Sequence, residues 1–334
     1  MLDLSLIWAA IIALGVFIYV VLDGFDLGIG LLFPLFPDQQ DRDVMMNTVA
    51  PVWDGNETWL VLGGACLLAA FPVVYAAVLS ALYLPLILML VGLIFRGVAF
   101  EIRAKANRTR PLWDMAFIGG SALASFCQGV ALGAYIQGIR VENREFAGGS
   151  MDWLSPFSLF TGLGVVVTYA MLGAGWLLIK TDGRLQARLY RLLRPLSLLF
   201  LFVIALVSLF TPLVDPAIAQ RWFAMPQLFW LLPLPLGVVL CAAAIWQALR
   251  RGQEYRPYWL TLLIVALGYA GLLISIWPHL IPPSITLWQA AAPASSQRFA
   301  LYGAVIILPL ILAYTALGYW VFRGKVRAGD GGYH

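Results

Sequence analysis

The sequence predicts an all-α, polytopic integral membrane protein with nine transmembrane helices. Of its 334 residues, 62% are hydrophobic and only 11% are Asp, Glu, Lys or Arg, whereas a soluble domain is about half apolar and a quarter charged. The apolar residues gather in stretches long enough to cross a bilayer, and the number of basic residues alternates from loop to loop. Too few polar residues remain to cover a water-exposed surface, which excludes a soluble enzyme and a nucleic-acid-binding protein.

Nine stretches meet the requirement of about 20 mostly apolar residues for a spanning helix. The first is long enough to tilt, and it lacks the basic segment and cleavage site of a signal peptide, so we expect it to remain as a helix. Because the connections are short, residues 1–334 are expected to form a single transmembrane domain. The stretches cover residues 6–33, 48–72, 76–100, 113–137, 155–179, 186–213, 227–249, 257–277 and 297–322.

The distribution of basic residues predicts the orientation of the chain. Seventeen of the 21 Lys and Arg residues fall on one side of the nine stretches and four on the other. Basic residues collect in cytoplasmic loops, so we expect the N-terminus outside and the C-terminus in the cytoplasm. Arg96, at the edge of the stretch 76–100, is counted here with the basic loop that follows it.

Small residues predict close contacts between helices. Gly24 and Gly28, like Gly129 and Gly133, are separated by three residues, a spacing that lets two membrane helices approach closely. The three cysteines have neither metal-site spacing nor a disulfide pattern, so we expect them to be packing residues.

Four acidic residues lie within the first two stretches, where a charge costs at least about 2.5–3.5 kcal/mol. Asp23 and Asp26 are three residues apart, as are Asp54 and Glu57, and this spacing places each pair on one face of a helix. Both pairs are expected in the cytoplasmic half of the membrane. Crowded carboxylates in such surroundings can accept and release protons near neutral pH, so the four acids predict a proton path. The two stretches that hold them contain no Lys or Arg.

Structural roles are the alternative for each of these acids. Asp54 and Glu57 follow a proline and could stabilise the start of a helix. Asp23 and Asp26 could be buried carboxylates that bond to a neighbouring helix or subunit. Asn56 is expected to be a hydrogen-bonding partner in either case.

Other polar residues carry weaker signals. Asp114 is expected to pair with Arg103 or Arg108 at the membrane surface, and Gln128 and Gln137 could line a cavity or bridge helices.

Several chemistries have no support in the sequence. It contains no HExxH motif, no Walker loop, no paired cysteines and no G-x-S-x-G motif. The two histidines, His279 and His334, both lie outside the predicted spans, and haem or copper in a membrane is ordinarily held by histidines within spans. No metal site and no catalytic residue is therefore expected in this chain, and any redox metal would be held by another chain.

At the acidic residues the sequence resembles subunit II of the cytochrome bd family of respiratory quinol oxidases. The resemblance begins with DGFDLGIG at residues 23–30 and NTVAPVWDGNETWL at residues 47–60. It continues with LGAYIQG at residues 132–138 and GWLLIK at residues 175–180. The combination with WDGNE is highly specific, and the motifs occur in order along most of the chain. The chain resembles a shorter member of the family, close to the cyanide-insensitive type.

The resemblance implies a fold, partners and cofactors. It implies two four-helix bundles plus one peripheral helix, packed on a similar subunit I in a bacterial cytoplasmic (inner) membrane. The complex oxidises quinol and reduces O2 to water without pumping protons, with haem b and haem d held by subunit I. A small single-span subunit, membrane lipid and a structural quinone or lipid in this chain are further possibilities that the family offers.

The resemblance also implies roles for the acids. Asp54 matches a carboxylate on a proton route from the cytoplasm towards the oxygen-reducing haem. Trp53, Asn56 and Trp59 are expected to support this route or the subunit interface, together with the other three acids. Some family members have glutamine where this chain has Glu57, which argues against an obligatory proton role there.

Two other functions remain open at this point. A proton-coupled secondary transporter also uses buried acids, but it often contains inverted repeats, and no clear repeat is visible here. In a purely structural assembly subunit, the acids would only hydrogen-bond to subunit I.

Overall fold

Eight helices in the described part of the chain, residues 3–327 and 329 of the computed structural model, are long and apolar enough to cross a membrane. They confirm eight of the nine predicted stretches. In chain order they are α1 (Leu4–Leu32), α5 (Tyr83–Arg103), α6 (Arg110–Gln137), α7 (Pro156–Lys180), α8 (Gly183–Val214), α11 (Pro233–Arg250), α12 (Arg256–Ile276) and α14 (Ala294–Val321).

The predicted span 48–72 corresponds to α3 (Trp53–Ala70), an 18-residue helix that begins with polar residues. Its first turns carry the WDGNET sequence, and it is not among the eight helices that meet the criteria for a membrane span. The helix ends at Ala70 because Phe71 precedes Pro72, the first residue of α4 (Pro72–Ala81), and a residue before proline is disfavoured in the helical conformation. A ninth membrane-spanning helix therefore stays a prediction.

Short elements close the two ends of the molecule. At one end lie η1 and α2, and at the other lie two small antiparallel hairpins and short helices. Their bounds are η1 (Phe33–Leu35), α2 (Gln39–Asn47), β1 (Val141–Glu142), β2 (Glu145–Phe146), α9 (Pro216–Phe223), α10 (Gln227–Leu231), β3 (His279–Ile281), β4 (Ile285–Thr286) and α13 (Leu287–Ala290).

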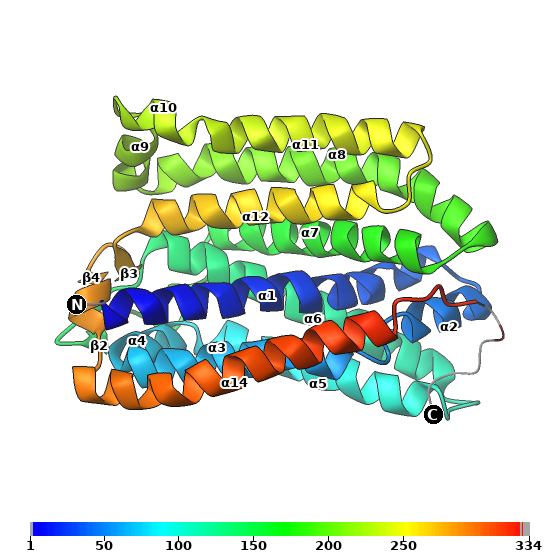
Figure 1. Ribbon diagram of the computed structural model, residues 1–334, viewed down its shortest axis with the longest axis horizontal. Coiled ribbons are helices and arrows are strands. Elements are labelled where there is room, and N and C mark those ends of the chain that lie inside the picture. The colour runs from blue at the N-terminus through cyan, green and yellow to red at the C-terminus, as the bar shows by residue number, and fades with distance from the viewer. Residues whose placement is uncertain (1–2, 328, 330–334) are drawn as a thin grey trace.

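The helices form the two bundles and the peripheral helix expected of this fold (Figure 1). In the first bundle α1 packs on α3 and α6, and α5 packs on α6. In the second bundle, α7 packs on α8 and α12, and α11 also packs on α8 and α12. Extensive contacts of α7 with α1 and α6 join the bundles, while α14 crosses α3 on the side away from α8 and α11.

Glycines set how closely the two bundles approach. A Cβ added at Gly28 of α1 would collide with the main-chain oxygen of Tyr169 on α7, and one at Gly173 of α7 would lie 2.6 Å from the main chain of Gly28. At the α6–α7 crossing, a Cβ added at Gly129 or Gly133 would lie 2.6 Å from backbone atoms of α7. Both predicted glycine pairs thus occupy close contacts that a larger residue could not make.

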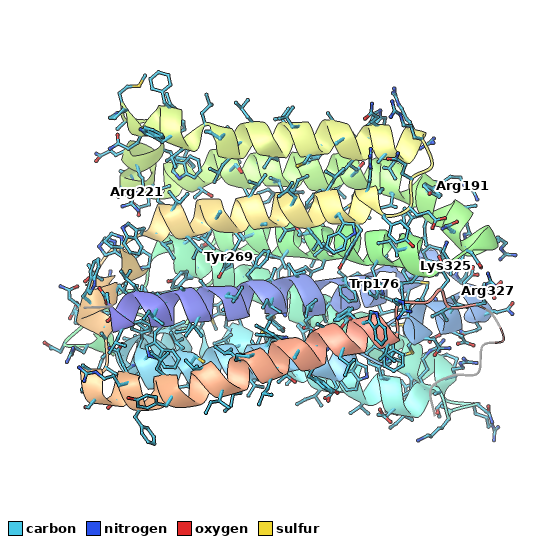
Figure 2. All side chains as sticks on the ribbon, viewed as in Figure 1. Trp176, Arg191, Arg221, Tyr269, Lys325 and Arg327 are labelled. Atoms are coloured by element: carbon cyan, nitrogen blue, oxygen red, sulfur yellow. The ribbon has the colours of Figure 1, made fainter. Side chains whose placement is uncertain are left out.

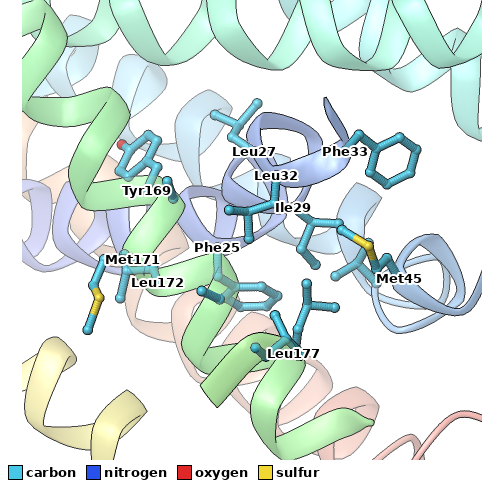
Figure 3. Packing of buried hydrophobic residues seen from close by; sticks show 14 of the residues in the cluster. Phe25, Leu27, Ile29, Leu32, Phe33, Met45, Tyr169, Met171, Leu172 and Leu177 are labelled. Carbon is cyan, nitrogen blue, oxygen red and sulfur yellow. The ribbon is translucent and has the colours of Figure 1, made fainter. Parts of the chain in front are cut away.

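Apolar side chains fill the space around these crossings. Phe25 of α1 stacks on Trp176 of α7, with ring centroids 4.3 Å apart. The residues that Figure 3 labels in this core come from α1, η1, α2 and α7: Phe25, Leu27, Ile29, Leu32, Phe33, Met45, Tyr169, Met171, Leu172 and Leu177. The charged residues described below are held inside this apolar framework.

Basic residues mark one end of the molecule. Arg191, Lys325 and Arg327 lie at the end that also carries α2, whereas Arg221 lies at the opposite end (Figure 2). Lys180, at the end of α7, donates hydrogen bonds to the main-chain oxygens of Phe322 and Gly324 and so caps the last turn of α14.

Candidate functional site

Two of the four predicted acids pair with one buried arginine. Arg96 of α5 is fully buried, and its Nη1 donates to Oδ1 of Asp23 at 2.7 Å. Its Nη2 donates to Oε1 of Glu57 on α3. Asp23 is 1% exposed, whereas the Glu57 side chain is 26% exposed. One guanidinium thus joins α1, α3 and α5 at the centre of the first bundle.

The position of Arg96 corrects the sequence-based view that it belongs to the basic loop. It lies seven residues before the end of α5 at Arg103, about 10 Å inside the helix. The sequence did contain a signal for this, because Arg96 falls within the predicted stretch 76–100. An arginine inside a span needs an internal partner, and acids were available in the first two stretches.

Asp26 forms a second branch of the cluster. Its Oδ2 accepts from Nδ2 of Asn56 at 2.7 Å, and Oδ1 of Asn56 accepts from the Tyr319 hydroxyl of α14 at 2.9 Å. Asp26 is 0% exposed, and its other oxygen, Oδ1, has no hydrogen-bond partner among the described residues. Asn56 is therefore a hydrogen-bonding partner, as predicted. Tyr319 was missed, because a tyrosine near the end of a span carries no signal of its own.

Asp54 lies apart from the buried cluster. It is exposed in the first turn of α3, where an acid interacts favourably with the helix dipole, and among the described residues its side chain has no hydrogen bond that caps the helix. Glu57 follows three residues later on the same face of α3, and its carboxylate pairs with Arg96. Glu57 therefore belongs to the cluster around Arg96 rather than acting as a helix cap.

Aromatic residues enclose the guanidinium side of the cluster. Trp53 stacks on Phe100, with ring centroids 5.0 Å apart, and the Arg96 guanidinium carbon lies 5.9 Å from the centroid of the Trp53 ring. Trp59 is 1% exposed, and its indole N–H has no partner within residues 3–327 and 329. Trp53 thus supports the cluster directly, whereas Trp59 packs in the bundle without a polar contact to it.

A second ion network fixes α2 under the first bundle. Asp114 of α6 accepts from Arg103 of α5 and, at 2.7 Å, from Arg42 of α2. Asp43 of α2 accepts from Arg103 at 2.8 Å and also from Arg110. The predicted pairing of Asp114 with Arg103 is confirmed. Asp114 also pairs with Arg42 of α2, and Arg103 also pairs with Asp43 of α2, so these ion pairs hold α2 in place.

The charges of the buried cluster do not balance if every acid is ionised. Asp23, Asp26 and Glu57 supply three carboxylates, and Arg96 supplies the guanidinium that faces them. Unbalanced charge in an apolar interior is costly unless a group binds a proton. The arrangement can therefore take up and release protons.

Comparison with known proteins agrees with this geometry. Residues 4–322 match the family model described as cytochrome bd terminal oxidase subunit II. The chain is 30% identical over 369 residues to cytochrome bd-I ubiquinol oxidase subunit 2 of Escherichia coli K12, with 98% of this chain and 96% of the relative covered. It is 31% identical to the probable cytochrome oxidase subunit 2 of Haemophilus influenzae, covering 97% and 96% of the two chains.

A solved structure shares the fold. A chain in the structure of bd oxidase from Geobacillus thermodenitrificans superposes with a TM-score of 0.75 at 18% identity, covering 96% of this chain and 99% of that one. The family match spans nearly all of the chain, including the α1 and α3 residues that form the cluster. The chain therefore belongs to the cytochrome bd terminal oxidase subunit II family.

Proposed function

We propose that this chain supports a haem-bearing subunit I of a quinol oxidase and supplies part of its cytoplasmic proton path for the reduction of O2 to water. The observation that carries the proposal is the excess of carboxylates over guanidinium in a buried cluster that reaches the surface through Glu57. Such a cluster can hold a proton inside the membrane and pass it on. Family membership favours this role over that of an independent transporter.

Asp54 is the proposed point of proton exchange between this chain and subunit I. It shares one face of α3 with Glu57, which contacts the cluster. Val61 and Leu68, further along α3, are 71% and 50% exposed, and Tyr314 of the neighbouring α14 is 71% exposed. Lipid could cover these apolar side chains, but a carboxylate among them needs water or a polar protein partner. Subunit I packed on this face would provide that cover.

The direction of proton uptake follows from the orientation of the chain. The end that carries α2, Arg191 and Lys325 is assigned to the cytoplasm, in agreement with the seventeen-to-four distribution of basic residues. Protons taken from that side for water formation, while quinol releases its protons outside, generate a membrane potential without pumping.

The haems are assigned to subunit I because this chain offers few haem ligands. The sequence has two histidines, and the described one, His279, lies in β3 outside the membrane-spanning helices. Haem iron in proteins is most often held by histidine. When bound in the complex, the haems would supply electron transfer and O2 reduction, and this chain's residues would hold and move protons.

Asp54→Asn is the direct test of the proton path. Loss of the titratable group is expected to lower quinol oxidase turnover by about 100-fold, at the low end of what a positioned proton-transfer group contributes, while haem content is retained. Glu101→Gln is the matched control, because Glu101 is an exposed carboxylate at the same end of the molecule, outside the cluster. Unchanged turnover in Asp54→Asn would remove Asp54 from the path. Joint loss of turnover and haem would support a purely structural role.

A further inference from the structure

A chain of hydrogen bonds approaches the cluster from the second bundle. Tyr19 lies one helical turn before Asp23 on α1 and is 5% exposed. Its hydroxyl oxygen accepts from Nε2 of Gln128 on α6 at 2.7 Å. Oε1 of Gln128 accepts from the hydroxyl of Tyr169 on α7 at 2.6 Å. Three helices thus contribute one polar side chain each to a path that leads to Asp23.

The orientation of the Gln128 amide sets the direction of these bonds. A tyrosine hydroxyl carries one proton, and an amide nitrogen donates while the amide oxygen accepts. Tyr169 donates its hydroxyl proton to the amide oxygen of Gln128, and the amide nitrogen of Gln128 donates to the hydroxyl oxygen of Tyr19. The hydroxyl proton of Tyr19 therefore takes part in neither bond. Tyr19 and Asp23 are four residues apart on α1, a spacing that places both side chains on one face of the helix.

Asp23 explains why the glutamine has this orientation. Its Oδ1 accepts from Arg96, while Oδ2 has no hydrogen-bond partner among the described residues. If the amide of Gln128 were reversed, the Tyr19 proton would point to Gln128, and Oδ2 would lose its nearby donor. A buried carboxylate oxygen without a donor is costly, so Asp23 favours the observed orientation.

The two aspartates of α1 therefore have unequal surroundings. Asp23 accepts from the Arg96 guanidinium, and Tyr19, whose hydroxyl proton is not used by Gln128, lies on the same face of α1. Asp26 accepts from the neutral amide of Asn56, and its Oδ1 is unpartnered among the described residues. Donors and positive charge stabilise an ionised carboxylate, and Asp23 has more of both.

We propose that Tyr19, held in place by Gln128 and Tyr169, is a positioning residue that keeps Asp23 ionised, so that the transferable proton of the cluster is carried by Asp26. The inference rests on the proposed function and deepens it. The groups that face Asp23 are Arg96 of α5, Glu57 of α3, Asp26 and Tyr19 of α1, Tyr169 of α7 and Tyr319 of α14, while α6 contributes the uncharged Gln128.

Tyr19→Phe in the intact complex is the test, because it removes the hydroxyl and keeps the ring. Without this donor, the protonated form of the cluster is favoured, so the pH at which turnover is half-maximal is expected to rise by about one unit. Tyr269→Phe is the matched control, because that hydroxyl also bonds to α1, but to the main-chain oxygen of Ala13. Haem content shows whether each variant assembles.

A spectroscopic measurement locates the proton independently of turnover. The redox-induced infrared difference spectrum of the native complex is expected to contain a protonated-carboxyl band that disappears in Asp26→Asn. A band that persists in Asp26→Asn would overturn the inference, as would a pH profile of Tyr19→Phe no different from that of Tyr269→Phe. Full turnover in Asp54→Asn would instead refute the proposed proton exchange with subunit I at Asp54, so the two failures are distinguishable.

Discussion

Replacing Arg96 with glutamine should destabilise the first bundle more than any exposed substitution. The guanidinium has zero exposure and pairs with Asp23, which is 1% exposed, and with Glu57, whose side chain is 26% exposed. Removing one member of a buried ion pair costs about 3–5 kcal/mol, because the partner's charge is left uncompensated. The Glu57 pair adds less, since that carboxylate can reach water. The expected loss for Arg96→Gln is therefore about 3–5 kcal/mol.

Equilibrium unfolding of the purified complex in mixed detergent micelles measures this loss. Arg96→Lys should recover only part of it, because one ammonium replaces two guanidinium nitrogens that bond to different carboxylates. Adding Asp23→Asn to Arg96→Gln should be less harmful than the sum of the two changes, since both members of the pair are then uncharged.

Arg251→Gln supplies the control for this experiment. Arg251 is exposed at the end of α11 and should change the unfolding free energy by no more than about 0.5 kcal/mol. If Arg96→Gln were within about 1 kcal/mol of the unchanged protein, the buried ion pair would not hold the bundle together, and the reasoning from burial would be wrong.

Two further predictions concern packing and pH. Gly28→Ala should destabilise the α1–α7 contact by about 1–3 kcal/mol, because its Cβ meets the Tyr169 oxygen, whereas Gly119→Ala, with open space around it, should be close to neutral in the same unfolding assay. A hydrogen bond from Lys325 lowers the pKa of Glu254, so this pair should stabilise the segment after α14 above the ordinary glutamate pKa and lose that small effect as pH falls. Hydrogen exchange of residues 322–327 at two pH values would show this, and a pH dependence unchanged in Glu254→Gln would contradict it.

Much of the fold could be predicted because the bilayer imposes a simple rule. Apolar length alone located eight helices that the structure confirms, including α1 and α14. The rule was least informative at α3, where the residues that form the site replace apolar ones and Pro72 interrupts the helix. The same polar residues made the site conspicuous in the sequence and the helix inconspicuous.

The site could be predicted only in part. Asp23, Asp26, Asn56 and Glu57 were found because polar groups are rare within spans, and the structure brings them together. Asp54, predicted with them, is separate from the buried group and exposed on α3. Arg96 was assigned to a loop, because basic residues near span ends usually mark the cytoplasmic surface.

By itself the sequence determined the membrane class, the order of the helices and which acids lie within apolar stretches. These features can be predicted because the cost of placing a charge in an apolar solvent depends on local composition. Only the tertiary structure decided which charges meet. Asp23 and Arg96 are 73 positions apart, and Tyr19, Gln128 and Tyr169 come from three helices. Such contacts depend on how helices cross, here at glycines such as Gly28 and Gly173, and a crossing is a property of two surfaces that no single stretch of sequence specifies.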